Sequence, residues 1–304
     1  MAAADSRGVR RIGQGSRRVA AALSRQRDEL LASALRLATV RVADVHRARV
    51  AARRLRSLLK TFQPLLDAHA VRPLRAELRS FAHALATVRE ADVRREMVLG
   101  LVRDGSTFTP AARRRVRSVL DGARRQARSQ LRQQFRAPGW AARLALLEAG
   151  LDSERLLDDR AAGSAQVLRR VNRTWREAVR LLERHPSAAA ELHELRLALK
   201  HCRYALEAIT DIAPAAAERL LGRLRAAQDA IGEHRDNELA TGWVTENARV
   251  LGAPLSRSLL AALERREPEL LAEAAEASER LLPAYRKWRA AVRQISRGSK
   301  RDRG

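Results

Sequence analysis

The segment from Val42 to Phe62 has two faces of opposite character when it is read as an α-helix, in which each residue turns by about 100°. Its apolar residues gather on one face, where they can pack against a core. The other face carries a stripe of basic residues three and four positions apart: His46, Arg49, Arg53, Arg56 and Lys60. Like charges at this spacing repel each other by about 0.2–0.5 kcal/mol per pair. The stripe therefore indicates either a solvated face or an anionic ligand that lies along the helix.

The same pattern recurs 147 residues later, in the segment from Leu192 to Ile209. The first four basic positions are matched one for one by His193, Arg196, Lys200 and Arg203. At the fifth position Glu207 replaces Lys60. Self-similarity of this kind indicates a duplicated structural unit. A pseudo-twofold arrangement of the two copies predicts that both stripes line one shared basic cavity.

The composition favours helices throughout the chain. Hydrophobic residues make up 46% of the sequence but aromatic residues only 3%, and the apolar positions are mostly Ala, Leu and Val. Arg, the commonest charged residue, is also a good helix former. Runs of alternating β-branched and aromatic residues, which are typical of strands, are nearly absent. We therefore expect an all-α protein built as two four-helix bundles, one from each half.

Composition shifts and helix breakers divide the chain. Residues 1–15 are expected to form a disordered basic tail and residues 295–304 a second basic tail. Between them, residues 16–294 are expected to form the folded part, with the first half at 16–151 and the second at 164–294.

Prolines suggest where individual helices begin and end. Thr109 and Pro110 are predicted to be the N-cap and first residue of a helix, and Pro73 is expected in the first turn of another. The helix that starts at Pro214 is predicted to end in the run from Gly232 to Asn237, and Pro268 to interrupt a later helix.

The net charge of +25 indicates a polyanionic partner. Nucleic acid, an anionic membrane surface and an inorganic polyanion all fit. All but four of the 60 basic residues are Arg, whose planar guanidinium binds phosphate oxygens in pairs. The charge is not confined to one helix with a large apolar face, so a membrane-surface role is disfavoured.

Cysteine content and hydropathy indicate a cytoplasmic location. Cys202 is the only cysteine, which excludes an intrachain disulfide, and we interpret it as a small helix residue. The chain has no run of 18 apolar residues, and the segment from Met1 to Ser16 has no apolar signal core.

Motifs of phosphate-converting or metal-dependent enzymes are missing from the sequence. It contains neither a G-x-x-x-x-G-K-[ST] loop nor an H-E-x-x-H pair. Asp92, Asp229 and Asp236 could serve as metal ligands, but salt-bridge or capping roles are the preferred interpretation. We therefore expect no catalytic activity, no cofactor and no metal.

The paired segments resemble the signatures of the CHAD family, the conserved-histidine α-helical domain. HRARVAARRLR (residues 46–56) and HELRLALKHCRY (residues 193–204) match the family's two histidine helices, and residues 85–93 and 231–240 resemble the segments that follow. The resemblance implies two four-helix bundles around a basic central cavity that binds inorganic polyphosphate, and for some members association with polyphosphate granules.

The resemblance also implies which residues face the phosphates. By motif these are His46, Arg49, Arg53, Arg56, His193, Arg196, Lys200 and Arg203, and Lys60 extends the first stripe. Second-tier candidates are Arg79, Arg89, Arg225 and Arg235.

Nucleic acid remains the alternative partner. The four tryptophans lie far apart in sequence and are interpreted as core or groove-lining residues, which disfavours stacking on single-stranded bases. A duplex requires only positive charge along its phosphate backbone. The helix expected over residues 111–135 is the most basic in the chain, although such helices are usually solvated. The sequence predicts neither the oligomeric state nor the preferred length of polyphosphate.

Overall fold

The structure is a computed structural model that describes residues 12–104 and 108–301, and within them it confirms the all-α fold. The only β-type pairing in these residues is an isolated bridge between Leu66 and Leu157. The first half contains α1 (Gln14–Leu35), α2 (Val42–Phe62), α3 (Ala68–Ala84), α4 (Ala86–Asp104), α5 (Pro110–Arg136), α6 (Gly139–Gly150) and the short α7 (Ser153–Leu156). The second half contains α8 (Ser164–Leu182), α9 (Ala189–Glu207), α10 (Pro214–Glu246), the short α11 (Ala248–Leu251), α12 (Ala253–Glu279) and α13 (Leu281–Arg301).

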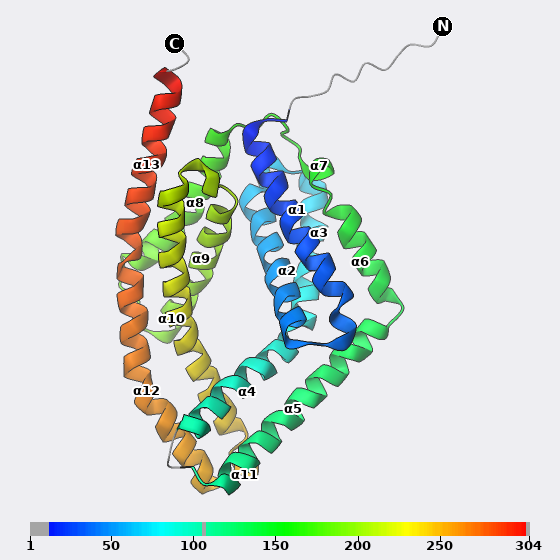
Figure 1. Ribbon diagram of the computed structural model, residues 1–304, viewed down its shortest axis with the longest axis vertical. Coiled ribbons are helices and arrows are strands. Elements are labelled where there is room, and N and C mark those ends of the chain that lie inside the picture. The colour runs from blue at the N-terminus through cyan, green and yellow to red at the C-terminus, as the bar shows by residue number, and fades with distance from the viewer. Residues whose placement is uncertain (1–11, 105–107, 302–304) are drawn as a thin grey trace.

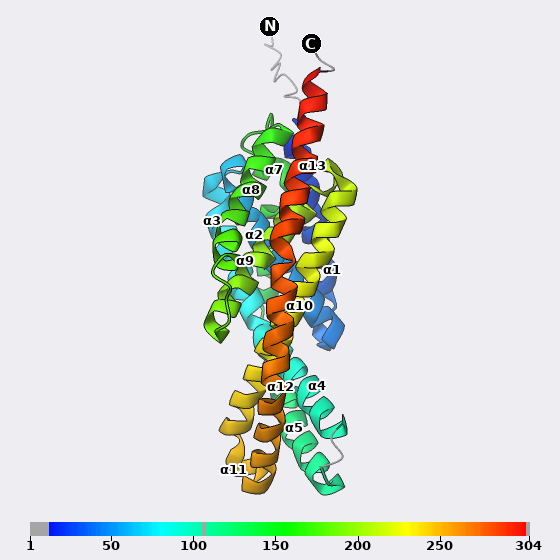
Figure 2. The ribbon, with the colours of Figure 1, turned by 90° about the vertical axis from the view of Figure 1, so that its left-hand side faces the viewer.

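The helices form an elongated molecule with one bundle from each half of the chain (Figure 1). The upper part holds α1, α2 and α3 on one side and α8, α9, α10 and α13 on the other. The lower part divides into the α4–α5 pair and the pair formed by α12 and the end of α10 (Figure 2). The stripe-bearing helices, α2 and α9, are the second long helix of their halves, and α5 and α12 both have 27 residues. The order of helices is therefore similar in the two halves.

Two apolar cores hold the molecule together, and each contains residues from both halves. The larger core joins Leu55 and Phe62 of α2 to Leu199 of α9 and Trp175 of α8. The smaller core joins α4 and α5 to α10, α11 and α12. All four tryptophans are at least 91% buried, as their interpretation as core residues required: Trp140, Trp175, Trp243 and Trp288.

The start of α1 is fastened to the segment that links the halves. The Gly13 amide donates to the carbonyl of Arg160 over 2.6 Å, and the Ser16 amide donates to that of Ala162 over 3.1 Å. A Cβ atom at Gly15 would lie 2.5 Å from the carbonyl oxygen of Gly163, so only glycine permits this approach. The two halves are therefore joined here by backbone contact.

Local helix signals gave some correct boundaries. The Thr109 hydroxyl accepts a hydrogen bond from the Ala112 amide over 3.2 Å, and Pro110 is the first residue of α5, which confirms the predicted cap. α2 ends at Phe62, two residues before Pro64, and α8 starts at Ser164.

Three predictions about where helices start, end or break are wrong. Pro73 lies inside α3, because Asp67 caps that helix by accepting from the His69 amide over 2.8 Å. Pro268 lies inside α12. α10 continues past Asn237, whose buried side-chain amide donates to the carbonyl oxygen of Leu263 on α12 over 3.2 Å. Packing between α10 and α12 thus outweighs the local tendency to break.

The expected tails lie mostly at the edge of what the structure describes. Residues 1–11 are outside the described residues, and α1 begins at Gln14. At the other end α13 continues to Arg301, into the segment that the sequence suggested as a tail. None of the described helices combines the length and the apolar content needed to cross a membrane.

Candidate functional site

The two basic stripes meet where α2 contacts α9. α4 packs against both α2 and α10, and α10 packs against α9, so four helices enclose this region. Two polar contacts join these helices. The Arg53 Nε atom on α2 donates to the Tyr204 hydroxyl on α9 over 3.0 Å, and Arg54 on α2 lies 3.5 Å from the Glu207 carboxylate on α9. Tertiary structure therefore brings together two segments that are 147 residues apart in the chain.

We call the residues gathered here the central basic cluster. These residues are close enough for the charge of one to lower the pKa of another. The charge of Arg89 lowers the pKa of His46, and that of Arg235 lowers the pKa of His193. The charge of Arg53 lowers the pKa of both Lys200 and Arg196. The cluster consists of His46, Arg49, Arg53, Arg89, His193, Arg196, Lys200 and Arg235. Eight of the 13 residues proposed from the sequence are thus brought together.

Lys200 is the most deeply placed cation of the cluster. Lys200 is only 8% exposed, and it has no hydrogen-bond or ion-pair partner among the described residues. Burial lowers the pKa of Lys200 to about 6, and the neighbouring charges of Arg53 and Arg196 act in the same direction. At neutral pH the unliganded protein therefore holds this amine mostly uncharged.

The two histidines behave in the same way. Burial, followed by the charge of Arg89, lowers the pKa of His46, and burial, followed by the charge of Arg235, lowers that of His193. The Nδ1 atom of His193 is buried without a hydrogen-bond partner in the described structure. Both imidazoles are therefore mainly neutral near pH 7 until an anion favours their protonated form.

Arg49 and Arg196 are held in place by neighbouring helices. An Arg49 terminal nitrogen donates to the carbonyl of Ala82 near the end of α3 over 2.9 Å. The Arg196 guanidinium packs against Gly232 of α10, where an added Cβ atom would lie 3.1 Å from its terminal nitrogen. Burial lowers the pKa of both guanidinium groups, yet they remain charged at any physiological pH. Their desolvation is a free-energy cost that a bound anion would offset.

Acidic neighbours only partly balance this charge. Asp236 is partly buried on α10, and burial raises the pKa of its carboxyl although Arg196 and Arg89 oppose the shift. Glu90 acts on Arg49, and Asp229 acts on Arg196. Glu238 accepts a hydrogen bond from Arg235 over 3.0 Å and also acts on His193. Four carboxylates thus face eight basic groups, and the region has an excess of potential positive charge.

The far end of the α2 stripe belongs to a second group next to α3. The charges of Arg79 and Arg75 act on Arg56, and that of Lys60 acts on His201. A second group is therefore formed by Arg56, Lys60 and Arg79. It lies further along α2, beyond the central basic cluster. Arg75, four residues before Arg79 on the same helical face, was not proposed as a phosphate ligand from the sequence.

Two predicted residues are placed differently. Arg203 lies 3.6 Å from Glu207 and over the ring of Tyr204, so it is partly neutralised, although its charge still acts on Lys200. Arg225 is exposed on α10, 11 residues before Asp236, and the structure shows no contact between it and the cluster.

Tyr204 is a further site residue that sequence reasoning missed. It is 2% exposed, accepts the bond from Arg53, and has the guanidinium groups of Arg54 and Arg203 at 5.5 and 5.1 Å from its ring centre. Such cation–π contacts hold Arg side chains in fixed positions. The only signal in the sequence was its place directly after Arg203, as one of just two tyrosines in the chain.

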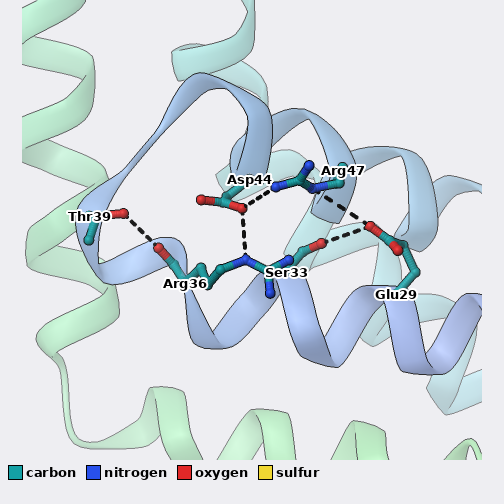
Figure 3. A network of polar contacts seen from close by, with 6 residues as sticks. All are labelled: Glu29, Ser33, Arg36, Thr39, Asp44 and Arg47. Carbon is teal, nitrogen blue, oxygen red and sulfur yellow. Dashed lines mark hydrogen bonds and ion pairs between the residues drawn. The ribbon is translucent and has the colours of Figure 1, made fainter.

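A polar network fixes the beginning of α2 relative to α1 (Figure 3). The buried Asp44 carboxylate accepts from Arg47 over 2.7 Å and from Arg36 Nε over 3.0 Å. These bonds hold the pKa of Asp44 below its usual range, so it stays ionised. Glu29 lies 3.8 Å from Arg47 and extends the network along α1. The first residues of the basic stripe therefore start from a rigid position.

Asp92 and Cys202 have structural roles. Asp92 accepts from Arg124 over 2.6 Å, which confirms the salt-bridge role preferred for it. Cys202 is fully buried and burial raises the pKa of its thiol, as expected of an inert core cysteine. Within the residues that the structure describes, no three His, Cys, Asp or Glu side chains are grouped so as to hold a metal ion.

Comparisons with known proteins agree with this geometry. The family model of the CHAD domain matches residues 21–245. Among solved structures, PptA from Streptomyces chartreusis is similar, with a TM-score of 0.69 and 26% identity over 89% of this chain and 99% of that one. The CHAD domain from the plant Ricinus communis has a TM-score of 0.71 and 20% identity over 88% of this chain and 92% of its own. None of the curated proteins matches this chain.

Proposed function

Because the chain belongs to the CHAD-domain family, we propose that it binds inorganic polyphosphate through the central basic cluster and does not catalyse its conversion. The observation that supports this most directly is the meeting of two basic stripes, from α2 and α9, around the buried Lys200. Partly desolvated cations without enough carboxylates are costly in an empty site. A dense polyanion supplies the missing charge.

Polyphosphate suits the arrangement better than a base-reading partner would. It is a flexible line of phosphate groups, and paired guanidinium nitrogens bind such oxygens well. The stripe from His46 to Lys60 extends over about 21 Å, at 1.5 Å per residue, and can serve several successive phosphates. All four tryptophans are buried and so offer no exposed stacking platform. By the family resemblance we further propose that the protein acts in the cytoplasm and associates with polyphosphate granules.

A comparison of salt dependence tests the proposal against general binding of nucleic acid. Long-chain polyphosphate and duplex DNA, matched in total phosphate, are titrated with the protein at increasing salt. Binding by neutralisation of phosphates alone weakens steeply with salt for any polyanion. We expect polyphosphate binding to survive salt concentrations that remove DNA, because the cluster is shaped and partly buried. Release of both polymers along the same salt slope would contradict a specific polyphosphate site.

Polyphosphate binding should strengthen as the pH falls. In the free protein Lys200 gains its proton only near pH 6, and the pKa values of His46 and His193 are also lowered. A bound polyanion favours the protonated forms, so binding takes up protons and affinity rises toward lower pH. Protonation of Asp236, whose pKa is raised, acts in the same direction. We expect affinity for long-chain polyphosphate to rise at least about tenfold between pH 8 and pH 6.

Lys200→Met identifies the source of this pH dependence. Methionine has a similar length and no charge, so the variant should bind more weakly and respond less to pH. Lys287→Met provides a matched control, because Lys287 is exposed on α13 and is not part of the cluster. Proton uptake is measured by calorimetry in buffers of different ionisation enthalpy. An unchanged proton uptake in the Lys200 variant would show that this amine does not titrate on binding.

A further inference from the structure

A second basic site lies between the start of α2, α4 and α5. A cavity of about 300 Å³ opens here, at the lower limit of the volumes typical of small-molecule sites. Four arginines line it: Arg95 and Arg103 from α4, and Arg117 and Arg124 from α5. Asp92 and Glu96 are the only acidic residues in its lining. The lining therefore has an excess of two positive charges.

Two of these arginines are held by carboxylates through one edge only. Arg95 Nε donates to Asp121 over 2.6 Å, and Arg124 Nε donates to the buried Asp92 over 2.6 Å. The bond from Arg95 keeps the pKa of Asp121 below its usual range, so this anchor remains charged. In the described structure the terminal nitrogens of both guanidinium groups have no hydrogen-bond partner. Both guanidinium groups are thus fixed in position while their terminal N–H groups remain available as donors, an arrangement that suits phosphate oxygens.

The other two arginines have no anchor. Arg103 and Arg117 are exposed, and neither has a hydrogen-bond or ion-pair partner among the side chains that the structure describes. They line the cavity from different helices, Arg103 from α4 and Arg117 from α5. A ligand between them would meet one guanidinium from each helix.

The beginning of α2 also lies at the cavity. Val42, the first residue of α2, lines the cavity, and no side chain caps this helix end. The first N–H groups of a helix have no acceptor within it and carry a partial positive charge. The network around Asp44 fixes this end of the helix (Figure 3). A fixed helix start and four guanidinium groups thus surround one cavity.

We propose that this cavity, which we call the α4–α5 pocket, binds a compact phosphate group with several negative charges. The group could belong to a free small phosphate compound or to the end of a polyphosphate chain. A chain end is feasible because Arg89 of the central basic cluster precedes Asp92, Glu96 and Arg103 at helical spacing on α4. The chain-end source rests on the proposed function, whereas the pocket itself does not.

Tripolyphosphate is a suitable probe, and its binding is measured by calorimetry on the full chain. The starting variant is R49E/R196E, which removes the central basic cluster as a competing site. Adding R103E/R117E to it should weaken tripolyphosphate binding at least about tenfold, because two charge-assisted contacts are lost. Adding R114E/R125E instead gives the same net charge from exposed α5 residues outside the pocket lining, and should preserve binding. Circular dichroism and melting temperature verify that each variant is folded.

The results distinguish the pocket from general charge effects and from the proposed function. Equal affinities in the two quadruple variants would overturn the proposal, as would failure of R49E/R196E to bind tripolyphosphate at all. Long-chain polyphosphate is then titrated into R103E/R117E alone. If R103E/R117E binds long-chain polyphosphate more weakly than R114E/R125E does, the pocket is supported as a site for chain ends. If R103E/R117E binds the long chain normally, while the quadruple variant with R103E/R117E has lost tripolyphosphate binding, the pocket is supported as a site for a free compound. Loss of long-chain binding in R49E/R196E is a separate result that concerns the central cluster only.

Discussion

Replacing Arg49 and Arg196 with glutamate should reduce the affinity for long-chain polyphosphate by at least about a hundredfold, on the order of 3 kcal/mol or more. These side chains come from opposite halves and lie in the same cluster. The charge of Arg53 lowers the pKa of both Arg49 and Arg196. The double change replaces two cations by two anions beside Lys200. It therefore removes attraction and adds repulsion at the centre of the proposed path.

The fold should tolerate this change, because neither side chain belongs to an apolar core and each introduced carboxylate lies next to cations of the cluster. Helicity by circular dichroism and the melting temperature serve as controls. R114E/R125E changes the net charge equally on exposed α5 positions and should leave polyphosphate affinity within about twofold. If instead the α5 variant lost binding to the same extent, the protein would be a general polyanion binder and the nucleic-acid alternative would be favoured. Unaltered affinity in R49E/R196E would exclude the central basic cluster as the site.

Neither half of the chain should fold on its own. Fragments 1–160 and 161–304 separate the two halves at the linking segment, and each fragment would expose one side of both cores. The larger core joins Leu55 of α2 to Leu199 of α9, and the smaller joins Val98 of α4 to Trp243 of α10. Each such side chain loses about 1.5–3 kcal/mol when it is no longer buried. A domain of marginal stability, about 5–15 kcal/mol, cannot withstand the loss of many of them.

Thermal unfolding followed by circular dichroism provides the measurement. We expect no cooperative transition from either fragment alone, and a cooperative transition with restored polyphosphate binding when the two are produced together. The intact chain under the same conditions is the control. A cooperative melt of an isolated half would show that the bundles are independent domains and that their shared cores contribute little to stability.

Much of the helical architecture was determined locally and could therefore be predicted from the sequence. Apolar residues at helical spacing gave α2 and α9, because a stripe of this kind can be buried only in a helix. Thr109 and Pro110 gave the start of α5 because capping depends on neighbouring residues alone. The likeness of the two histidine segments indicated a shared site before any contact was known.

The tertiary structure decided what depends on distant residues. α3 starts before the position expected from Pro73 because Asp67 caps it. The breaks expected at Pro268 and in the run from Gly232 did not occur, since contacts between helices outweigh local preferences of about 1–3 kcal/mol. The role of Tyr204 also emerged only from its contact with Arg53, 151 residues away.

The sequence alone determined that this chain is helical, strongly basic and equipped with two matching stripes, because periodicity and charge are properties of each segment. Which cations share a site was decided by folding. Lys200 lost most of its solvent and its ordinary pKa because α2, α8 and α10 pack against α9, and Arg203 was partly neutralised by Glu207. Two arginines of the α4–α5 pocket, Arg117 and Arg124, lie on the helix that the sequence suggested was solvated. Burial and electrostatic coupling act through space between segments far apart in the chain, so they are not encoded at any single position.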